Sequence, residues 1–417
     1  MIRRRAFASP TDELKRSSVT PCRAVVATRS QLHGRHARGA EKHTRIHMNL
    51  DELNFDLPPE RIAQRPLAAR DASRMLLLDK TTGTWADRQF REFPDLLRGD
   101  ELIVLNNARV LPARLFGRRV GIHAEPPGIH NRARHEHLQS PIEVLLVRQL
   151  SPDTWETLVR PGRKISVGEK IIFGERARDG EGELAAVAES RGEYGLRVLR
   201  FICKSGFHEA LSRLGHIPLP PYIKRADEPA DRERYQTIYA RQGNAVAAPT
   251  AGLHFTTEIL ERIRARGIAV AEVTLDVGLG TFAPVRTARL EDHKIHVESY
   301  EIPEPTAQAI AKAQNEARPV LAIGTTVVRA LEDAAEKSAQ RGSSTLNPGK
   351  SAAAIFLYPS RPLRVVNQLL TNFHLPRSSL LALVATLAGQ ENILRAYRHA
   401  VAAEYRFYSY GDCMLIR

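Results

Sequence analysis

The sequence has few cysteines and no long apolar run. Its three cysteines, Cys22, Cys203 and Cys413, lie far apart among 417 residues and form no C-x-x-C pair. This spacing argues against a disulfide framework, a structural zinc site and an iron–sulfur cluster. The longest apolar run, residues 380–388, contains a threonine and is far shorter than the about 18–20 residues that a membrane span needs. We therefore expect a cytoplasmic protein without a transmembrane helix.

Two common nucleotide-binding fingerprints are also missing. No G-x-G-x-x-G follows a first expected strand, and no G-x-x-x-x-G-K-[ST] occurs. The sequence therefore supports neither a Rossmann dinucleotide enzyme nor a P-loop NTPase.

Positive charge is in excess and is unevenly spread. The chain holds 61 Lys and Arg against 47 Asp and Glu, a net charge of +14, and residues 1–47 alone hold 11 against 3. This head lacks hydrophobic periodicity, so we expect it to be disordered. Three interpretations fit residues 1–47. The start can be assigned too early, with Met48 as the true first residue; the segment can be a basic arm that holds RNA; or it can be an organellar transit peptide. The mildly basic body permits a nucleic-acid partner.

The body shows two textures, which predict two domains. Residues 110–204 give short alternating segments typical of an antiparallel β-barrel or sandwich, namely 142–147, 155–159, 170–173, 184–188 and 196–201. Residues 205–417 alternate helix and strand, which predicts a mostly parallel sheet with helices on both faces. The expected helices are 257–266, 305–317, 325–337, 378–388 and 392–403, and the expected strands are 268–277, 319–323 and 405–416.

The predicted fold class is therefore α/β. A three-layer α/β/α sheet domain is expected over residues 48–109 and 205–417, with an inserted small β-barrel domain over 110–204. Within the barrel, residues 121–140 carry four histidines and almost no large apolar residue, so we expect a solvated, flexible surface insertion without a metal. Residues 337–351 are expected to be a second polar loop.

Polar residues gather where strands are expected to end, the edge at which α/β sheets bind ligands. Gly324, Thr325 and Thr326 lie between an expected strand and a helix that bears Arg329. A glycine allows close approach of the backbone, and a helix N-terminus offers free N–H groups. An ordinary N-cap is the alternative interpretation. The pair Gly278 and Gly280 is a weaker motif of the same kind.

Two histidines end loops of small or polar residues. His254 follows the segment 248–253, and His374 follows Thr371 and Asn372. Each imidazole can act as acid, base or hydrogen-bond donor near neutral pH, or can be a structural hydrogen-bonding group.

The segment 293–298 puts His293, His296 and Glu298 within six residues. A metal site there would need a helix where the sequence favours a strand, so hydrogen bonding to a substrate hydroxyl is preferred. Basic turns at 160–164 and 224–225 can follow a phosphate backbone or can simply be solvated surface.

Taken together and in this order, these segments resemble one family, the S-adenosylmethionine:tRNA ribosyltransferase-isomerases of queuosine biosynthesis. The resemblance runs from residue 48 to residue 416. It is carried by FDLPPERIAQRP (55–66), SRMLLLD (73–79), GDELIVLNNARVLPARLFG (99–117), VRPGRK (159–164), HIPLPPYIKR (216–225), AVAAPTAGLHFT (245–256), GLGTFAPV (278–285), HKIHVE (293–298), AIGTTVVRALE (322–332), LLTNFHLPRSSLL (369–381) and YRFYSYGD (405–412).

The chain departs from the family pattern at four positions. Ala108 stands where the family usually has Thr, Asp276 where it usually has His, Asn367 where it usually has Asp, and Ser360 where it usually has Gly. The change at Asp276 matters most, because a carboxylate in place of an imidazole alters any proton transfer there.

The resemblance implies an enzyme, a transferase and isomerase of tRNA modification. S-adenosylmethionine would donate its ribosyl carbons to 7-aminomethyl-7-deazaguanine at the tRNA wobble position, with release of adenine and methionine and formation of epoxyqueuosine. A sulfonium acidifies the adjoining ribose C–H, so a base can start ring opening while an acid assists the departure of adenine. The expected partners are S-adenosylmethionine, consumed as a co-substrate, and the tRNA anticodon stem-loop. No metal, further cofactor or membrane is expected, and we expect a monomer.

The resemblance also implies a site where the loops 248–256, 278–282, 324–326 and 371–376 converge. His254 is the preferred acid or base and His374 the second. Phe282 or Phe255 is expected to stack on adenine, and Arg329 or Glu298 to bind ribose hydroxyls or the methionine end. The expected substrate-binding residues are Asn106, Arg109, Pro249, Thr250, Gly252, Phe255, Gly278, Gly280, Thr281, Phe282, His293, His296, Glu298, Gly324, Thr325, Thr326, Arg329, Thr371, Asn372, Tyr410 and Asp412. The expected RNA-binding residues are Arg114, Arg160, Arg163, Lys164, Lys224 and Arg225.

Two other functions remain open at this point. The first is a non-catalytic RNA-binding or chaperone protein that keeps the fold and has lost the activity. The departure from the family pattern at Asp276 is the reason to consider it. An ordinary S-adenosylmethionine methyltransferase would need an early strand followed by a glycine-rich turn, which is missing. The products discriminate them, because methyl transfer leaves S-adenosylhomocysteine and an RNA-binding protein releases no adenine.

Overall fold

The computed structural model describes residues 49–119, 141–176, 182–204, 206–278 and 296–417. By its internal contacts the chain divides into two units, Met1–Thr44 and Arg45–Arg417, and all described residues belong to the second. The basic head and the insertion expected at 121–140 lie outside the described residues. Among the described helices, none combines the length and the apolar character needed to cross a bilayer.

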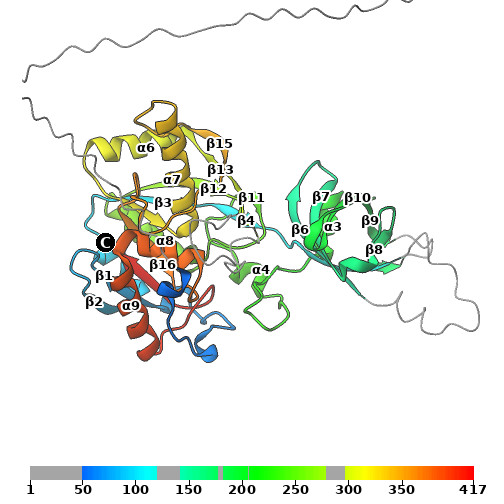
Figure 1. Ribbon diagram of the computed structural model, residues 1–417, viewed down its shortest axis with the longest axis horizontal. Coiled ribbons are helices and arrows are strands. Elements are labelled where there is room, and N and C mark those ends of the chain that lie inside the picture. Colours follow the sequence, from blue (N-terminus) through cyan, green and yellow to red (C-terminus); the bar gives the residue numbers. More distant parts are fainter. Residues whose placement is uncertain (1–48, 120–140, 177–181, 205, 279–295) are drawn as a thin grey trace, which may run out of the picture. The chain divides into compact units, whose positions relative to one another are not determined.

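A nine-stranded sheet forms the α/β part (Figure 1). From one edge to the other its strands are β15 (Gly349–Ala353), β13 (Glu298–Ile302), β12 (Ala269–Leu275), β3 (Leu102–Asn106), β14 (Val320–Ile323), β16 (Gln368–Asn372), β17 (Cys413–Ile416), β1 (Arg74–Leu78) and β2 (Trp85–Gln89). A separate parallel pair joins β4 (Ala108–Val110) to β11 (Gln242–Ala245).

The sheet is mixed rather than mostly parallel. The pairs β12–β3, β3–β14, β14–β16 and β17–β1 are parallel, and the other neighbouring pairs are antiparallel. The expectation of a mostly parallel sheet therefore holds around β3 and is wrong toward both edges. At the β2 edge the cause is chain length: the segment 79–84 between β1 and β2 can close a hairpin but is too short for a parallel crossover.

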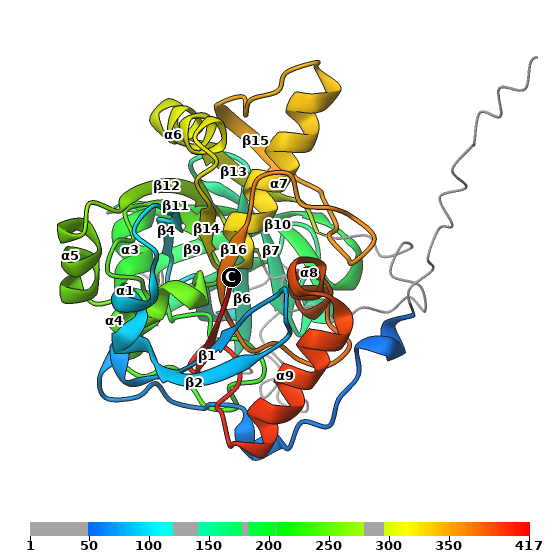
Figure 2. The ribbon, with the colours of Figure 1, turned by 90° about the vertical axis from the view of Figure 1, so that its left-hand side faces the viewer.

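Side chains of the central strand β3 alternate between two cores. Leu102 and Val104 pack in one cluster with the helices α6 to α9, whereas Ile103 and Leu105 pack in another with α1 and α5. Because successive side chains of a strand point to opposite faces, helices cover both faces of the sheet. Figure 2 shows α8 and α9 on one side of β1, and α1 and α5 on the other. The predicted three-layer α/β/α arrangement is confirmed.

The helices mostly begin and end where the sequence indicated. Their bounds are α1 (Phe93–Leu96), α3 (Phe207–Leu214), α4 (Asp231–Arg234), α5 (Thr257–Ala265), α6 (Glu304–Asn315), α7 (Thr325–Gln340), α8 (Ser379–Ala388) and α9 (Gln390–Ala402). Thr256 and Ser378 cap α5 and α8 through their hydroxyl groups. Gly267 follows α5 at φ +73°, a conformation that glycine adopts without strain.

Two segments differ from the sequence expectation. The polar loop expected at 337–351 is shorter, because α7 continues to Gln340 and β15 begins at Gly349. The expected strand 405–416 contains a strand only at its end, β17. Before it, Tyr408 has φ +72°, which breaks an extended chain, and the preceding aromatic residues pack as loop side chains in the core.

The inserted segment forms a closed antiparallel barrel, as the sequence predicted. Its strands are β5 (Arg114–Arg119), β6 (Ile142–Gln149), β7 (Thr154–Arg160), β8 (Lys170–Arg176), β9 (Gly182–Arg191) and β10 (Leu196–Cys203). A backbone bridge joins the first residue of β5 to a residue just after α3. The N–H of Arg114 donates to the carbonyl of His216 at 3.1 Å, and the reverse hydrogen bond measures 2.8 Å.

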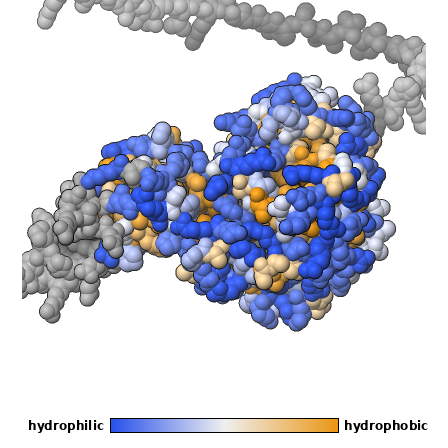
Figure 3. All heavy atoms as spheres, turned by 180° about the vertical axis from the view of Figure 1, so that it is seen from behind, coloured by the Kyte–Doolittle hydropathy of each residue, from blue (hydrophilic) through white to orange (hydrophobic). Residues whose placement is uncertain are grey.

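The surface is largely hydrophilic on the face seen in Figure 3, with apolar residues grouped on part of the larger body. The polar sides of the helices account for this, since their apolar sides belong to the two cores.

Candidate active site

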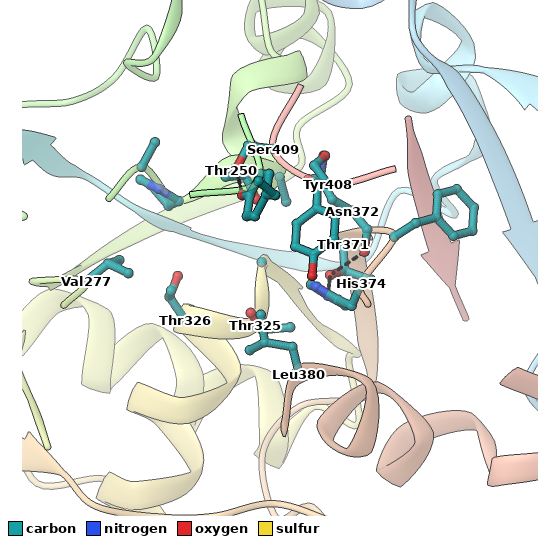
Figure 4. Close-up of a pocket in the computed structure, with 16 residues that line it drawn as sticks. Thr250, Val277, Thr325, Thr326, Thr371, Asn372, His374, Leu380, Tyr408 and Ser409 are labelled. Carbon is teal, nitrogen blue, oxygen red and sulfur yellow. Dashed lines mark hydrogen bonds between the residues drawn. The ribbon is translucent and has the colours of Figure 1, made fainter. Parts of the chain in front are cut away.

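A pocket, here called the main pocket, opens where three polar loops meet (Figure 4). It holds about 500 Å³ of space, part of which is open to solvent. Of the four loops expected to converge, 248–256, 324–326 and 371–376 line the pocket. From the fourth, 278–282, only the preceding residue Val277 does so among the described residues. The lining residues are Tyr222, Ala248, Pro249, Thr250, Ala251, Val277, Gly324, Thr325, Thr326, Thr371, Asn372, Phe373, His374, Leu380, Tyr408 and Ser409.

One wall of the main pocket is the beginning of α7. β14 ends at Ile323, Gly324 turns the chain with φ +94°, and α7 starts at Thr325 without a side-chain cap on its first N–H groups. Thr325 and Thr326 add hydroxyl groups to this wall, and the Thr326 Oγ1 accepts a hydrogen bond of 3.3 Å from the Asn106 amide. The wall offers both hydrogen-bond donors and the positive end of a helix dipole.

Asn106 holds this region together from beneath. Its amide also donates to the Leu275 carbonyl at 3.1 Å, and its Oδ1 accepts from the N–H groups of Ala108 and Leu275. Because the side chain is fully buried and satisfied, Asn106 positions Thr326 rather than lining the pocket.

His374 lines the main pocket at the end of β16. Its Nε2 lies 2.9 Å from the Thr371 Oγ1, and its backbone N–H donates to the Tyr397 hydroxyl at 3.2 Å. Burial lowers the pKa of His374 to about 3, so the imidazole is neutral at pH 7.

An aromatic wall faces these polar groups, and the sequence did not indicate it. Tyr222 and Tyr408 lie with ring centroids 3.9 Å apart, and the Tyr222 Oη lies 2.5 Å from the Ser409 Oγ. Both tyrosines belong to segments that carry the family resemblance, PPYIKR and YRFYSYGD. Their distance in the sequence, which is 186 positions, hides the pairing.

A second cavity adjoins the main pocket. It holds about 300 Å³ of space, part of which is open to solvent, and Ser409 lines both cavities. The remaining lining residues are Pro66, Leu67, Ala69, Arg70, Ser73, Arg234, Leu253, His254, Tyr410 and Gly411.

His254 lies in this second cavity rather than beside His374. Its Nδ1 is 2.7 Å from the Ser73 Oγ, and its buried Nε2 has no hydrogen-bond partner among the described residues. Burial chiefly lowers the pKa of His254 to about 4; a contact with Asn372 raises it, and the charges of Arg70 and Arg406 lower it further. The sequence predicted His254 and His374 in one pocket. In the structure His374 lines the main pocket and His254 lines the second cavity.

Two residues of the 248–256 segment serve packing. Phe255 is fully buried, edge-on to Phe90 and Phe93 in the core beneath α5, so it offers no face for adenine. The expectation that it stacks on the base is not supported. Gly252 faces Tyr239, whose Oη would lie 2.1 Å from an added Cβ, so close packing and not ligand contact explains this glycine.

Arg329 and Glu298 form a buried ion pair and line neither cavity. The Arg329 guanidinium contacts the Glu298 carboxylate and donates to the carbonyls of His296 and Ala353, while Glu298 also accepts from the Gly278 N–H at 2.9 Å. The structure therefore assigns this pair to holding β13 and the start of the glycine segment against α7, in place of the ribose contact expected from the sequence.

Asp276, the departure from the family pattern, lies one residue before Val277. Its Oδ1 accepts a hydrogen bond of 2.7 Å from the Asn244 N–H. Burial is the main cause that raises its pKa, and the nearby charge of Glu298 adds to the rise. The carboxyl therefore holds a proton more readily than an ordinary aspartate.

The remaining expected substrate residues divide into three groups. Gly280, Thr281, Phe282 and His293 lie outside the described residues. Arg109 and His296 are exposed. Tyr410 donates a hydrogen bond to Asp231 at 2.7 Å and lines the second cavity. Asp412 accepts hydrogen bonds from the backbone N–H groups of Arg74 and Arg406 and thereby fixes a turn.

The basic residues expected to bind RNA also differ from one another. Arg160, Arg163 and Lys224 are exposed. Arg225 instead binds Asp231 through two hydrogen bonds of 2.7 and 2.8 Å. Arg114 pairs with Glu143 at 3.2 Å. The side chain of Lys164 lies outside the described residues.

Comparisons with known proteins identify close relatives of the whole body. The sequence profile of the family described as "Queuosine biosynthesis protein" matches residues 50–416. The S-adenosylmethionine:tRNA ribosyltransferase-isomerase of Solibacter usitatus is 52% identical over 371 residues, which are 88% of this chain and all of the relative. The protein of the same name from Symbiobacterium thermophilum is 44% identical over 370 residues, with the same shares. A crystal structure of S-adenosylmethionine tRNA ribosyltransferase from Thermotoga maritima is 32% identical, with a TM-score of 0.45, 88% of this chain and 100% of that chain covered.

Proposed function

This chain belongs to the queuosine biosynthesis protein family, and we propose that it is an S-adenosylmethionine:tRNA ribosyltransferase-isomerase. In this reaction the ribosyl part of S-adenosylmethionine moves onto 7-aminomethyl-7-deazaguanine at the tRNA wobble position and rearranges, and adenine and methionine leave. The donor is consumed, and no further cofactor is proposed. Since tRNA is the acceptor, the enzyme acts in the cytoplasm.

The main pocket carries this proposal, because its walls suit a nucleoside. The hydroxyl groups of Thr325 and Thr326 at the α7 N-terminus can bind ribose oxygens. The rings of Tyr222 and Tyr408 offer an aromatic surface for adenine, the role that the sequence had given to Phe255 or Phe282. Pro249 and Thr250 also line this pocket.

We assign proton transfer in the main pocket to His374. As a neutral imidazole it has a lone pair that can accept the proton that the sulfonium acidifies on the ribose, although a pKa near 3 makes it a weaker base than an ordinary histidine. Because burial keeps its pKa near 3, the imidazolium gives the proton up readily, and departing adenine is the group that needs one. His254, in the adjoining cavity, is the second proton-transfer group of the proposal.

tRNA is proposed to approach along the exposed basic residues. Arg160, Arg163 and Lys224 are accessible for phosphate contacts. The modified base must leave the anticodon stack to reach the pocket, as in other enzymes that act on a base. Arg225 and Arg114 are excluded from this set by their carboxylate partners.

The full chain, incubated with S-adenosylmethionine and tRNA bearing the aminomethyl base, tests the proposal. We expect release of adenine and methionine and an anticodon nucleoside with the mass of epoxyqueuosine. Formation of S-adenosylhomocysteine would instead identify a methyltransferase. Binding of tRNA without adenine release would identify an RNA-binding protein that has lost activity.

The variant Asp276→His separates the last outcome from a failed assay. If wild type is inactive because of its carboxyl at 276, D276H restores adenine release. If wild type is active, Asp276→Asn asks whether this carboxyl takes part in the reaction.

A further inference from the structure

We propose that the second cavity is an oxyanion subsite, which binds a carboxylate or phosphate group belonging to a substrate held in the main pocket. This inference rests on the proposed function, because that function supplies the two possible sources of the anionic group. One is the carboxylate of the methionine part of S-adenosylmethionine, and the other is a backbone phosphate of the tRNA. Arg70, Arg234 and His254 are the side chains that would bind it.

Two guanidinium groups line the cavity without a carboxylate partner. Arg70 donates to the backbone carbonyls of Leu253 and Glu233 at 3.2 and 2.8 Å. Arg234 donates to the carbonyls of Ala68 and Leu67 at 2.9 and 2.8 Å. Within the described ranges, neither guanidinium has a carboxylate oxygen within 4.0 Å. Both positive charges are thus oriented by neutral groups.

The two charges repel each other. The pKa of Arg70 is lowered first by burial and next by the positive charge of Arg234, against a smaller opposing effect of Glu233. The nearby carboxylate of Asp231 is already engaged by Arg225 and Tyr410. An oxyanion between Arg70 and Arg234 would therefore supply a missing counter-charge, and guanidinium groups match carboxylate and phosphate oxygens well.

Two further polar atoms at the cavity lack a partner. The Arg234 Nε is buried without a hydrogen bond among the described residues. The buried His254 Nε2 likewise makes no hydrogen bond there, and the side chain of Asn372 is its polar neighbour. In the tautomer whose Nδ1 accepts from the Ser73 hydroxyl, Nε2 carries the proton and can donate it. Buried donors are normally satisfied, and an oxyanion acceptor would satisfy them.

The position of the cavity connects it to the main pocket. Ser409 lines both cavities, and the single segment 249–254 contributes Pro249 and Thr250 to one and Leu253 and His254 to the other. A substrate in the main pocket can therefore extend a charged end past Ser409. A bound anion would also offset the positive charges of Arg70 and Arg406 that lower the pKa of His254, bringing this imidazole closer to a working acid.

The test compares Arg234→Gln with Arg232→Gln in the full chain. Arg232 is a matched control, because it lies on the same helix α4 and also donates to two backbone carbonyls, those of Ser212 and Gly215, yet it lines neither cavity. Calorimetry measures the Kd of S-adenosylmethionine, and filter binding measures the Kd of tRNA at several salt concentrations. Both are binding measurements that need no turnover.

We expect R234Q to weaken one of the two ligands by about tenfold or more, the usual size for a charge-assisted hydrogen bond, and R232Q to leave both unchanged. If the cavity binds the carboxylate of S-adenosylmethionine, R234Q raises the Kd of S-adenosylmethionine and leaves the Kd of tRNA unchanged. A tRNA phosphate predicts a higher Kd for tRNA and a salt dependence reduced by about one charge. Arg234→Lys, which keeps the charge, is expected to lose less than R234Q.

Unchanged affinity of a folded R234Q for both ligands would overturn the subsite. If R234Q fails to unfold cooperatively on heating, Arg70→Gln and R234K take its place with the same expectations. Failure of the proposed function shows separately, as wild-type protein that binds both ligands and releases no adenine.

Discussion

The buried imidazole of His374 predicts a specific loss of stability in acid. Burial lowers its pKa from 6.5 to about 3. As the pH falls below about 6.5, the unfolded chain binds a proton that the folded protein does not bind, so the free energy of unfolding declines down to about pH 3. Each pKa unit is worth about 1.4 kcal/mol, and pH 5 lies about 1.5 units below 6.5, so this residue alone removes about 2 kcal/mol between pH 7 and pH 5.

The variant His374→Gln isolates this effect. Its amide can keep a hydrogen bond to Thr371 but cannot titrate, so its stability difference from wild type should shrink by about 2 kcal/mol from pH 7 to pH 5. Urea unfolding at pH 7, 6 and 5 measures the difference, and other titrating groups cancel in it. His208→Gln, at an exposed position on α3, is the control. A difference that stays constant within about 0.5 kcal/mol would refute a buried, neutral imidazole.

Three further outcomes follow from contacts described above. Glu298→Gln leaves the Arg329 guanidinium buried without its carboxylate, and urea unfolding should show a loss of about 3–5 kcal/mol. Gly252→Ala places a Cβ 2.1 Å from the Tyr239 hydroxyl, which should cost about 1–3 kcal/mol in thermal unfolding; an unchanged Tm would contradict this packing. Arg163→Gln should weaken tRNA binding with a salt slope reduced by about one, and a salt slope equal to that of wild type would remove Arg163 from the RNA surface.

Much of the fold could be predicted because it depends on local pattern. The alternation of helix and strand after residue 205 and the short β segments before it fix the layers and the barrel, which the structure contains. The antiparallel edges of the sheet and the loop before β17 could not be predicted from periodicity alone. The antiparallel β1–β2 pair depends on the short connection between these strands, and the loop before β17 depends on the positive φ of Tyr408.

The site was predictable at the level of loops but not of single side chains. The ends of β14 and β16, which lie at one edge of the large sheet, bring 324–326 and 371–374 together, and the segment after β11 adds 249–251 to the pocket. Which way each side chain points depends on its partners, and these are distant in sequence. Ser73 holds His254 in the second cavity, Glu298 holds Arg329 away from both, and Phe90 and Phe93 hold Phe255 in the core.

The backbone bridge between Arg114 and His216 bears on how this protein came to have two parts. The chain leaves for the barrel and returns from it at two residues that exchange both of their backbone hydrogen bonds. A segment whose ends meet in this way can be gained, lost or exchanged as a cassette without stretching the fold that hosts it. Joining residues 114 and 216 by a short glycine linker should therefore leave a foldable α/β host, and evolution can exchange the barrel as one unit.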